Sequence, residues 1–192
     1  MTAREEFKQE LTNAASRVFA KFGYKKTTLD DIALLLGKGK TSFYYYFEGK
    51  DGLYKAVLET EANQVLQAIE MAVANGTTAT EKLSAYVTMR FQSKLNSSIL
   101  CEAFTHDAIK NMELVKPVIT HFQAQNIKTL QVILEYGVTQ NEFALEEIKL
   151  AAITLETVLN GLEPHLYEYR QSDHLNQRIH QLLNLLFNGI KK

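Results

Sequence analysis

Apolar residues recur along the whole chain at spacings of three and four positions, the period of amphipathic α-helices. In the first segment, from Thr2 to Phe22, they form one stripe that ends before Gly23: Phe7, Leu11, Ala14, Ala15, Val18, Phe19 and Phe22. The same periodicity predicts later helices at about 50–74, 80–95, 98–112, 117–137, 148–164 and 173–190. We expect Pro117 to open its helix and Pro164 to kink or end the next one. The predicted fold class is all-α.

Residues 27–47 contain two short helical patterns separated by a turn of about three residues. Thr28 is a predicted N-cap, because Asp31 three positions later completes a capping box. Ile32, Ala33, Leu35 and Leu36 are predicted to form the apolar side of this helix, and Gly37 ends it by adopting a left-handed backbone. The second helix is expected from Lys40 to Phe47. This layout is typical of a DNA-binding helix-turn-helix.

The second short helix has a predicted outward face suited to DNA. Phe43 and Phe47 lie four positions apart and are expected to point inward, which turns outward Lys40, Thr41, Ser42, Tyr44 and Tyr45. Lysine and hydroxyl groups suit phosphates and base edges, and a tyrosine ring suits the thymine methyl group. For Tyr46, the sequence leaves open a phosphate contact or packing.

At these residues the chain resembles the TetR family of bacterial transcriptional repressors. The resemblance rests on a threonine before an Ile-Ala pair, a turn glycine, a lysine-led helix ending Phe-Tyr-Tyr-Tyr-Phe, and a lysine that opens the next helix. The chain departs from the family pattern at Lys38, where a small apolar residue is usual, and at Gly39, where a serine-like cap is usual. The DNA contacts implied by the resemblance and the exposed face are Thr28, Lys38, Lys40, Thr41, Ser42, Tyr44, Tyr45, Tyr46 and Lys50.

The resemblance also implies two functional domains along the chain. A three-helix DNA-binding head is expected at residues 1–48, and an effector-binding and dimerisation body at residues 49–192. Such a repressor binds a near-palindromic double-stranded DNA operator as a homodimer and is released by a small-molecule effector. The last helix carries an apolar arc too wide for one neighbour. Either it is buried inside a monomer, or, as the resemblance implies, the last two helices form a four-helix dimer seam through Leu155, Leu159, Leu182, Leu183 and Leu186.

Composition and charge change this picture only slightly. The chain of 192 residues has a net charge of −1, which taken alone gives no sign of nucleic acid. The first 55 residues carry +3 and the remainder −4, so the segment with the helix-turn-helix is the basic one. The single cysteine, Cys101, excludes an intrachain disulfide. With a charged N-terminal segment and no apolar run of membrane-spanning length, we expect a cytoplasmic protein without membrane contact.

Other chemistries find little support in the sequence. Cys101, His106, Asp107 and His121 lack the spacing of a zinc site, and no nucleophile or phosphate-loop motif occurs, so no metal, no cofactor and no enzyme activity are expected. An effector pocket is predicted from aromatic and polar residues of the body, which could equally be core: Tyr86, Arg90, Phe91, Phe104, Phe122 and Tyr136. The alternative function is a helical protein-interaction module that does not bind DNA.

Overall fold

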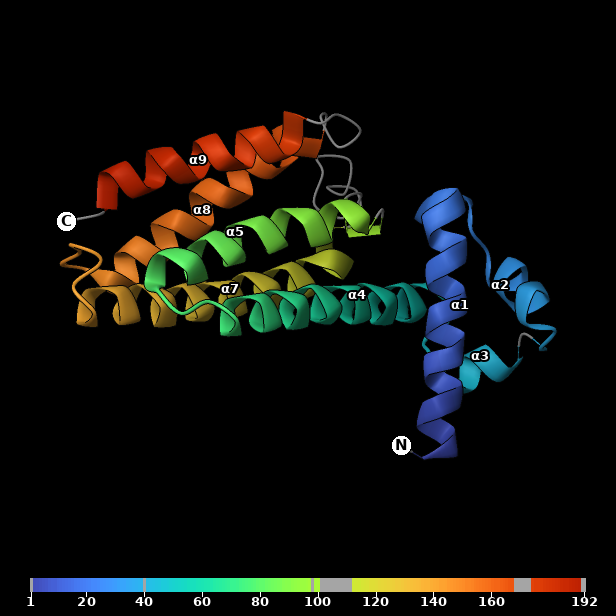
Figure 1. The fold of residues 1–192 in the computed structure, drawn as a ribbon. Coiled ribbons are helices and arrows are strands. Elements are labelled where there is room, and N and C mark those ends of the chain that lie inside the picture. The colour runs from blue at the N-terminus through green and yellow to red at the C-terminus, as the bar shows by residue number, and fades with distance from the viewer. Residues whose placement is uncertain (1, 40, 98, 101–111, 168–173, 191–192) are drawn as a thin grey trace. The chain divides into compact units, whose positions relative to one another are not determined.

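The computed structural model describes residues 2–39, 41–97, 99–100, 112–167 and 174–190 (Figure 1). Within these ranges the chain forms eight α-helices, which confirms the predicted all-α class. The helices are α1 (Ala3–Lys26), α2 (Leu29–Leu36), α3 (Thr41–Tyr46), α4 (Gly49–Ala74), α5 (Ala79–Asn96), α7 (Met112–Thr139), α8 (Ile148–Tyr167) and α9 (His174–Ile190). Most of the helix predicted at 98–112 lies outside the described residues.

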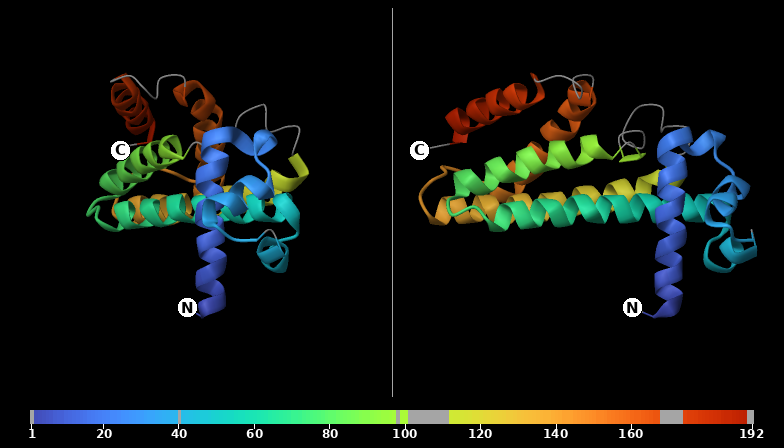
Figure 2. Two further views of the ribbon diagram at one scale, coloured as in Figure 1. Left: turned by 90° about the vertical axis from the view of Figure 1, so that its right-hand side faces the viewer. Right: turned by 45° about the vertical axis from the view of Figure 1, so that its right-hand side comes forward.

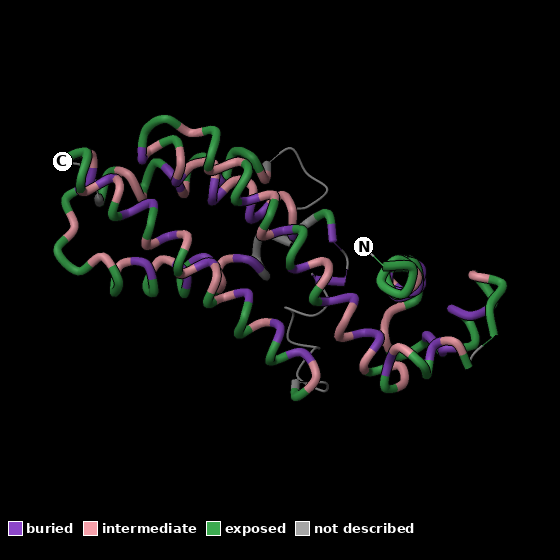
Figure 3. Tube along the Cα trace, turned by 90° about the horizontal axis from the view of Figure 1, so that it is seen from below, coloured by how far each residue is buried: buried purple, intermediate pink, exposed green. Residues whose placement is uncertain are grey.

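The helices belong to two compact units. The first comprises Met1–Ala62 and Ser97–Val118, and the second Asn63–Asn96 and Ile119–Lys192. Helices α1, α2 and α3 lie wholly in the first unit, and α5, α8 and α9 lie wholly in the second. Two further views show the individual helices (Figure 2), and buried and exposed residues alternate along them as expected for amphipathic helices (Figure 3).

Helix α1 begins and breaks where the sequence predicts. The backbone N–H of Thr2 donates to the Glu5 carboxylate at 2.7 Å, and the N–H of Glu5 donates to the Thr2 hydroxyl at 3.3 Å, which completes the capping box. Helical geometry is interrupted at Gly23, whose φ of 75° is open to glycine at little cost. The buried apolar stripe runs from Leu11 to Phe19, whereas Phe22 is exposed.

Helix α2 has the predicted cap and the predicted end. The Thr28 N–H donates to the Asp31 carboxylate at 2.8 Å, and Gly37 adopts φ 59° and ψ 30°. The predicted apolar side is wrong at Leu35, which is exposed. The buried arc of this short helix runs from Leu29 through Ile32 to Ala33, and Leu35 lies beyond its edge.

Pro117 and Pro164 both lie inside helices. Helix α7 begins at Met112, so Pro117 does not open it as predicted. The missing N–H of Pro117 costs one bond to the Glu113 carbonyl, close to a helix start where few intrahelical bonds have formed. Helix α8 continues past Pro164 to Tyr167 and therefore does not end there.

The turn after α7 caps α5 from far along the chain. The Glu142 carboxylate accepts hydrogen bonds from the backbone N–H groups of Ala79 at 2.8 Å and Thr80 at 3.0 Å. Phe143 is buried against the backbone of α7, where a Cβ on Gly137 would lie 2.1 Å from its ring. Gly137 therefore allows the ring to approach the helix.

Candidate functional site

The face of α3 is exposed where the sequence predicts. Phe43 and Phe47 are buried, and this fixes which side of α3 faces away from the interior. Tyr44 and Tyr45 are 57% and 67% exposed, Thr41 is exposed and Ser42 is half-buried. Lys40 lies outside the described residues. The described part of this face therefore presents two hydroxyl groups and two tyrosine rings to a partner.

The other side of α3 packs against aromatic and basic side chains of α1 and the turn. The Tyr46 ring lies 5.5 Å from the Phe7 ring, so Tyr46 is a packing residue in this arrangement. The Lys38 ammonium lies 5.5 Å from the same Phe7 ring, and Lys38 remains exposed. The ammonium of this lysine thus lies over an aromatic ring while the residue stays open to solvent.

Lys50, the predicted phosphate contact at the start of α4, is held by the end of α1. Its ammonium donates to the Tyr24 carbonyl oxygen at 3.0 Å and lies 4.1 Å from the Tyr24 ring centre. The Tyr24 hydroxyl donates in turn to the Asp51 carboxylate. Burial raises the pKa of Tyr24 to about 12, and the Asp51 carboxylate adds to that effect. The Lys50 side chain is therefore pre-positioned rather than free to rotate.

Thr28, another predicted DNA contact, is already engaged in its cap. Its hydroxyl donates to the Asp31 carboxylate at 2.7 Å and accepts from the Asp31 backbone N–H at 3.2 Å. The Thr28 hydroxyl and the Thr28 backbone N–H both donate to the Asp31 carboxylate, and these two hydrogen bonds lower the pKa of Asp31 below its ordinary value.

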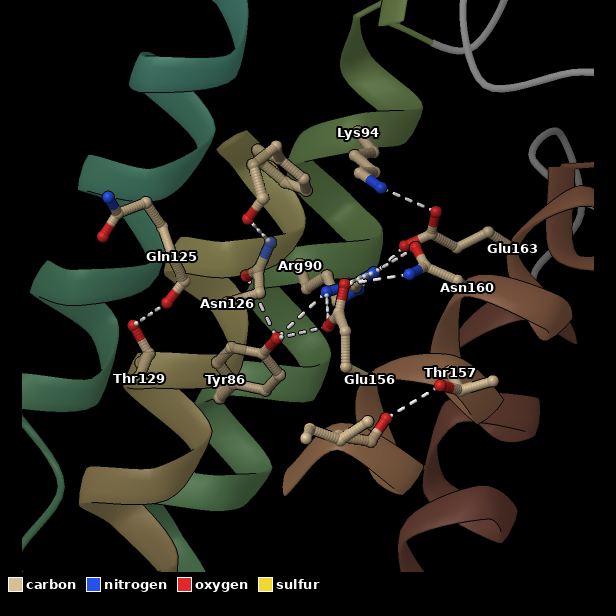
Figure 4. Close-up of polar contacts among 12 residues, drawn as sticks. Tyr86, Arg90, Lys94, Gln125, Asn126, Thr129, Glu156, Thr157, Asn160 and Glu163 are labelled. Atoms are coloured by element: carbon tan, nitrogen blue, oxygen red, sulfur yellow. Dashed lines mark hydrogen bonds and ion pairs between the residues drawn. The ribbon is translucent and has the colours of Figure 1, made fainter. Parts of the chain in front are cut away.

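The second unit contains a buried polar cluster centred on Arg90 of α5 (Figure 4). The Arg90 guanidinium donates through Nη1 to Glu156 at 2.5 Å and through Nε to Glu163 at 2.8 Å. It also donates to the Tyr86 hydroxyl at 3.0 Å and to Asn160 at 2.7 Å. With a second bond to Glu156 at 3.2 Å, all five N–H donors of Arg90 are bonded. The cluster therefore joins α5 to α8 with complete hydrogen bonding at the arginine.

Lys94 completes the cluster one turn further along α5. Its ammonium donates to Glu163 at 2.6 Å and lies 4.6 Å from the Phe122 ring of α7. Tyr86 links the same network to α7, because its hydroxyl donates to Asn126 at 3.0 Å. Two cations thus meet two carboxylates, and the formal charge of the group is balanced.

The pKa directions follow from burial and from this pairing. Burial lowers the pKa of Lys94 to about 8, although the Glu163 carboxylate opposes that shift. Burial would also lower the pKa of Arg90, but the carboxylates of Glu163 and Glu156 together raise it. Burial raises the pKa of Glu156 above its ordinary value against the pull of Arg90. An opposite charge at hydrogen-bonding distance therefore opposes the desolvation of each charge, and it outweighs desolvation at Arg90 but not at Lys94 or Glu156.

The structure gathers part of the predicted effector set. Tyr86, Arg90 and Phe122 belong to the polar cluster, and Phe91 is also fully buried. Tyr136 lies elsewhere, since its hydroxyl donates to the Thr77 carbonyl at 3.1 Å beside the α4–α5 turn. Phe104 lies outside the described residues.

Sequence reasoning missed the residues that complete the cluster: Lys94, Asn126, Glu156, Asn160 and Glu163. The spacing of charged residues along α5 and α8 could have predicted this cluster. Lys94 follows Arg90 by four positions, and Glu156 and Glu163 flank Leu159 on the apolar side of α8. Opposite charges on the inward faces of two helices indicate a buried ion pair rather than two solvated faces.

Helices α8 and α9 leave apolar side chains exposed. Of the predicted seam residues, Leu159 and Leu183 are buried within the chain, while Leu155, Leu182 and Leu186 are half-buried. A groove of about 430 Å³ lies beside them, lined by Glu147, Leu150, Ala151, Thr154, Leu155, Val158 and Leu186. Leu185 on α9 is 73% exposed.

The described part of the chain contains neither a metal-binding cluster nor a membrane-spanning helix. No group of three or more His, Cys, Asp or Glu side chains is placed to hold a metal ion there. Three residues that the sequence analysis considered as zinc ligands and set aside lie outside that part: Cys101, His106 and Asp107. None of its helices is long and apolar enough to cross a membrane.

Comparisons with known proteins agree with this architecture. Residues 11–57 match the family model for bacterial regulatory proteins of the tetR family, and residues 61–192 match that for the C-terminal region of QacR-like proteins. The transcriptional regulator QacR of Staphylococcus aureus is 23% identical over 193 residues, covering 96% of this chain and 98% of QacR. RutR of Escherichia coli K12 is 45% identical over 51 residues, covering 27% of this chain and 24% of RutR.

A solved structure extends the similarity to the whole fold. The crystal structure of a transcriptional regulator from Cytophaga hutchinsonii is 27% identical with a TM-score of 0.77, covering 96% of this chain and 98% of that one. The family models cover both the helix-turn-helix and the C-terminal region, and the relatives are transcriptional regulators. The chain therefore belongs to the TetR family of DNA-binding bacterial regulatory proteins.

Proposed function

We propose that this protein is a transcriptional repressor that binds a near-palindromic operator as a homodimer and leaves it when a small-molecule effector binds. The observation that carries the proposal is the exposed face of α3, held outward by buried Phe43 and Phe47. The residues proposed to contact DNA are Thr28, Lys38, Lys40, Thr41, Ser42, Tyr44, Tyr45, Tyr46 and Lys50. Of these, Tyr44 and Tyr45 are proposed to choose the sequence, and the lysines to bind phosphates.

We place the functional boundary at residue 48, with DNA binding before it and effector binding and dimerisation after it. A second copy of the chain is proposed to cover the exposed apolar side chains of α8 and α9. Two heads then bind two half-sites together, which raises affinity far above that of one short helix.

The exposed leucines of α9 offer a direct test of the dimer. Leu185→Glu places a charge at a position that is exposed in one chain and buried in the proposed dimer, so the variant should sediment as a monomer. Its operator affinity should fall by at least about 100-fold because each head then binds alone. Met71→Glu, at a similarly exposed apolar position on α4, should remain dimeric. A Leu185→Glu variant that stays dimeric would place the seam elsewhere.

The effector is proposed to bind beside Tyr86, Arg90, Phe91 and Phe122; of the other residues predicted for this pocket, Tyr136 lies elsewhere and Phe104 lies outside the described residues. Because the donors of Arg90 are all bonded in this structure, a ligand that accepts from its guanidinium must displace a present partner, and we propose that this partner is Glu156 or Glu163. A ligand changes operator affinity only by binding one conformation better than the other. The paired and separated arrangements of the cluster are the proposed two conformations.

Selection from a random pool of duplexes, followed by a salt titration of the winning duplex, tests the function. We expect a palindromic consensus, and an affinity that falls steeply with salt as phosphate contacts require. Deleting the gene should raise expression from a reporter that carries the consensus. Failure to enrich any duplex would reject the proposal in favour of a helical protein-interaction module.

A further inference from the structure

The first two turns of α1 carry basic side chains beside α3 that the helix-turn-helix pattern does not include. Arg4 and Lys8 lie four positions apart, and both are exposed. Arg4 and Lys8 lie on the same face of α1 as the buried residues Leu11, Ala15 and Val18, nearer the N-terminus. At positions where this stripe would continue as apolar side chains, the chain has two cations.

Both cations are placed by aromatic rings at α3. The Arg4 guanidinium carbon lies 5.2 Å from the centre of the Tyr45 ring, and the Lys8 ammonium lies 5.7 Å from that of Phe47. Tyr45 is one of the exposed tyrosines proposed to contact bases. Arg4 therefore contacts α3 itself, and Lys8 contacts the residue that directly follows α3.

The electrostatic surroundings leave these charges available. Among the residues that the structure describes, neither Arg4 nor Lys8 forms an ion pair with a carboxylate. Glu5 is engaged at the helix start through its bond to the Thr2 N–H. At about 100° per residue, Glu6 and Glu10 fall on the opposite side of α1. The side of α1 next to α3 is therefore positive.

We propose that Arg4 and Lys8 bind phosphates of the operator duplex, extending the DNA interface from α3 onto α1. A guanidinium held over a ring by cation–π attraction can still donate its N–H groups to phosphate oxygens. Duplex DNA is the partner whose regular line of phosphates suits two cations on one helical face beside a recognition helix. This inference rests on the proposed function, since it assumes that α3 binds DNA.

The test measures how the affinity for the selected duplex depends on salt. Arg4→Ala and Lys8→Ala should each reduce the slope of log affinity against log salt by about 0.9, and the double variant by about twice that. Arg17→Ala is the matched control, because Arg17 is an exposed arginine on the same helix whose Nε donates to the Asn13 carbonyl. Arg4→Lys keeps the charge and should restore the slope even if Arg4→Ala weakens the helix.

Each outcome decides between the two proposals. This inference would be overturned if both alanine variants and the double variant had the same salt slope as the wild-type protein. DNA binding by α3 would then still stand. A slope lost in Arg17→Ala as strongly as in Arg4→Ala would also overturn it, because the effect would then be one of net charge. If the wild-type protein binds no selected duplex, the proposed function itself fails, and this inference fails with it.

Discussion

The two units use the same basic residue types in opposite ways. In the first unit, Arg4 and Lys38 lie over aromatic rings with their charges exposed. In the second unit, Arg90 and Lys94 are fully buried and face carboxylates. A ring orients a cation without neutralising it, whereas a carboxylate neutralises it. The first arrangement suits an external anion, and the second satisfies the charges internally.

The largest effect should come from removing one charge of the buried cluster. Glu163→Ala leaves two buried cations without their shared carboxylate, and we expect a loss of about 3–5 kcal/mol in the free energy of unfolding. Urea denaturation would measure it. Glu59→Ala removes half of an exposed pair with Lys55 on α4 and should cost no more than about 1 kcal/mol. Equal losses for the two variants would contradict the contrast between buried and exposed charges.

A smaller effect, on sequence choice, is expected at the exposed face. Tyr45→Ala removes a ring that is proposed to contact a thymine methyl group, so preference should weaken at one or two operator positions by about 1–3 kcal/mol each. Stability should change little because the ring is mostly exposed. Duplex selection with wild type and variant would show the difference. Identical consensus sequences from both would assign Tyr45 no part in base recognition.

The smallest effect concerns the pH dependence of stability. The folded pKa of Lys94 is about 8, against an ordinary value of 10.5, so the unfolded chain binds more protons between these two values. The free energy of unfolding contributed by Lys94 therefore rises with pH across that window. The free energy of unfolding of wild type, minus that of Lys94→Met, should therefore rise from pH 8 to pH 10. A stability of wild type relative to Lys94→Met that stays constant or falls between pH 8 and pH 10 would refute the expected sign.

Local signals predicted the first unit well. The caps at Thr2 and Thr28, the left-handed Gly37 and the inward Phe43 all depend on residues within four positions of one another. Short-range geometry of this kind is encoded by the sequence alone. The positions of Arg4 and Lys8 against α3 were not predicted, because they depend on how two separate helices pack.

The second unit was harder to predict for the same reason. The apolar periodicity gave its helices, but the partners of Arg90 lie 66 and 73 positions away on α8. Glu156 and Glu163 interrupt an apolar face and look unfavourable until the opposing cations are known. Burial of four charges is acceptable only when all of them are brought together, and that condition belongs to the tertiary structure.

The hydrogen bonds of Glu142 also bear on the order in which the chain is made. During synthesis α5 leaves the ribosome before Glu142, which follows the helix start by more than 60 residues. Until then, the start can be held locally, because the Glu81 N–H donates to the Thr78 hydroxyl at 3.1 Å and the Glu81 carboxylate accepts from the Thr78 N–H at 3.2 Å. The local cap needs only its neighbours, whereas the distant one needs all of α7. The beginning of α5 is thus secured once as the helix emerges, and again when the C-terminal half has folded onto it.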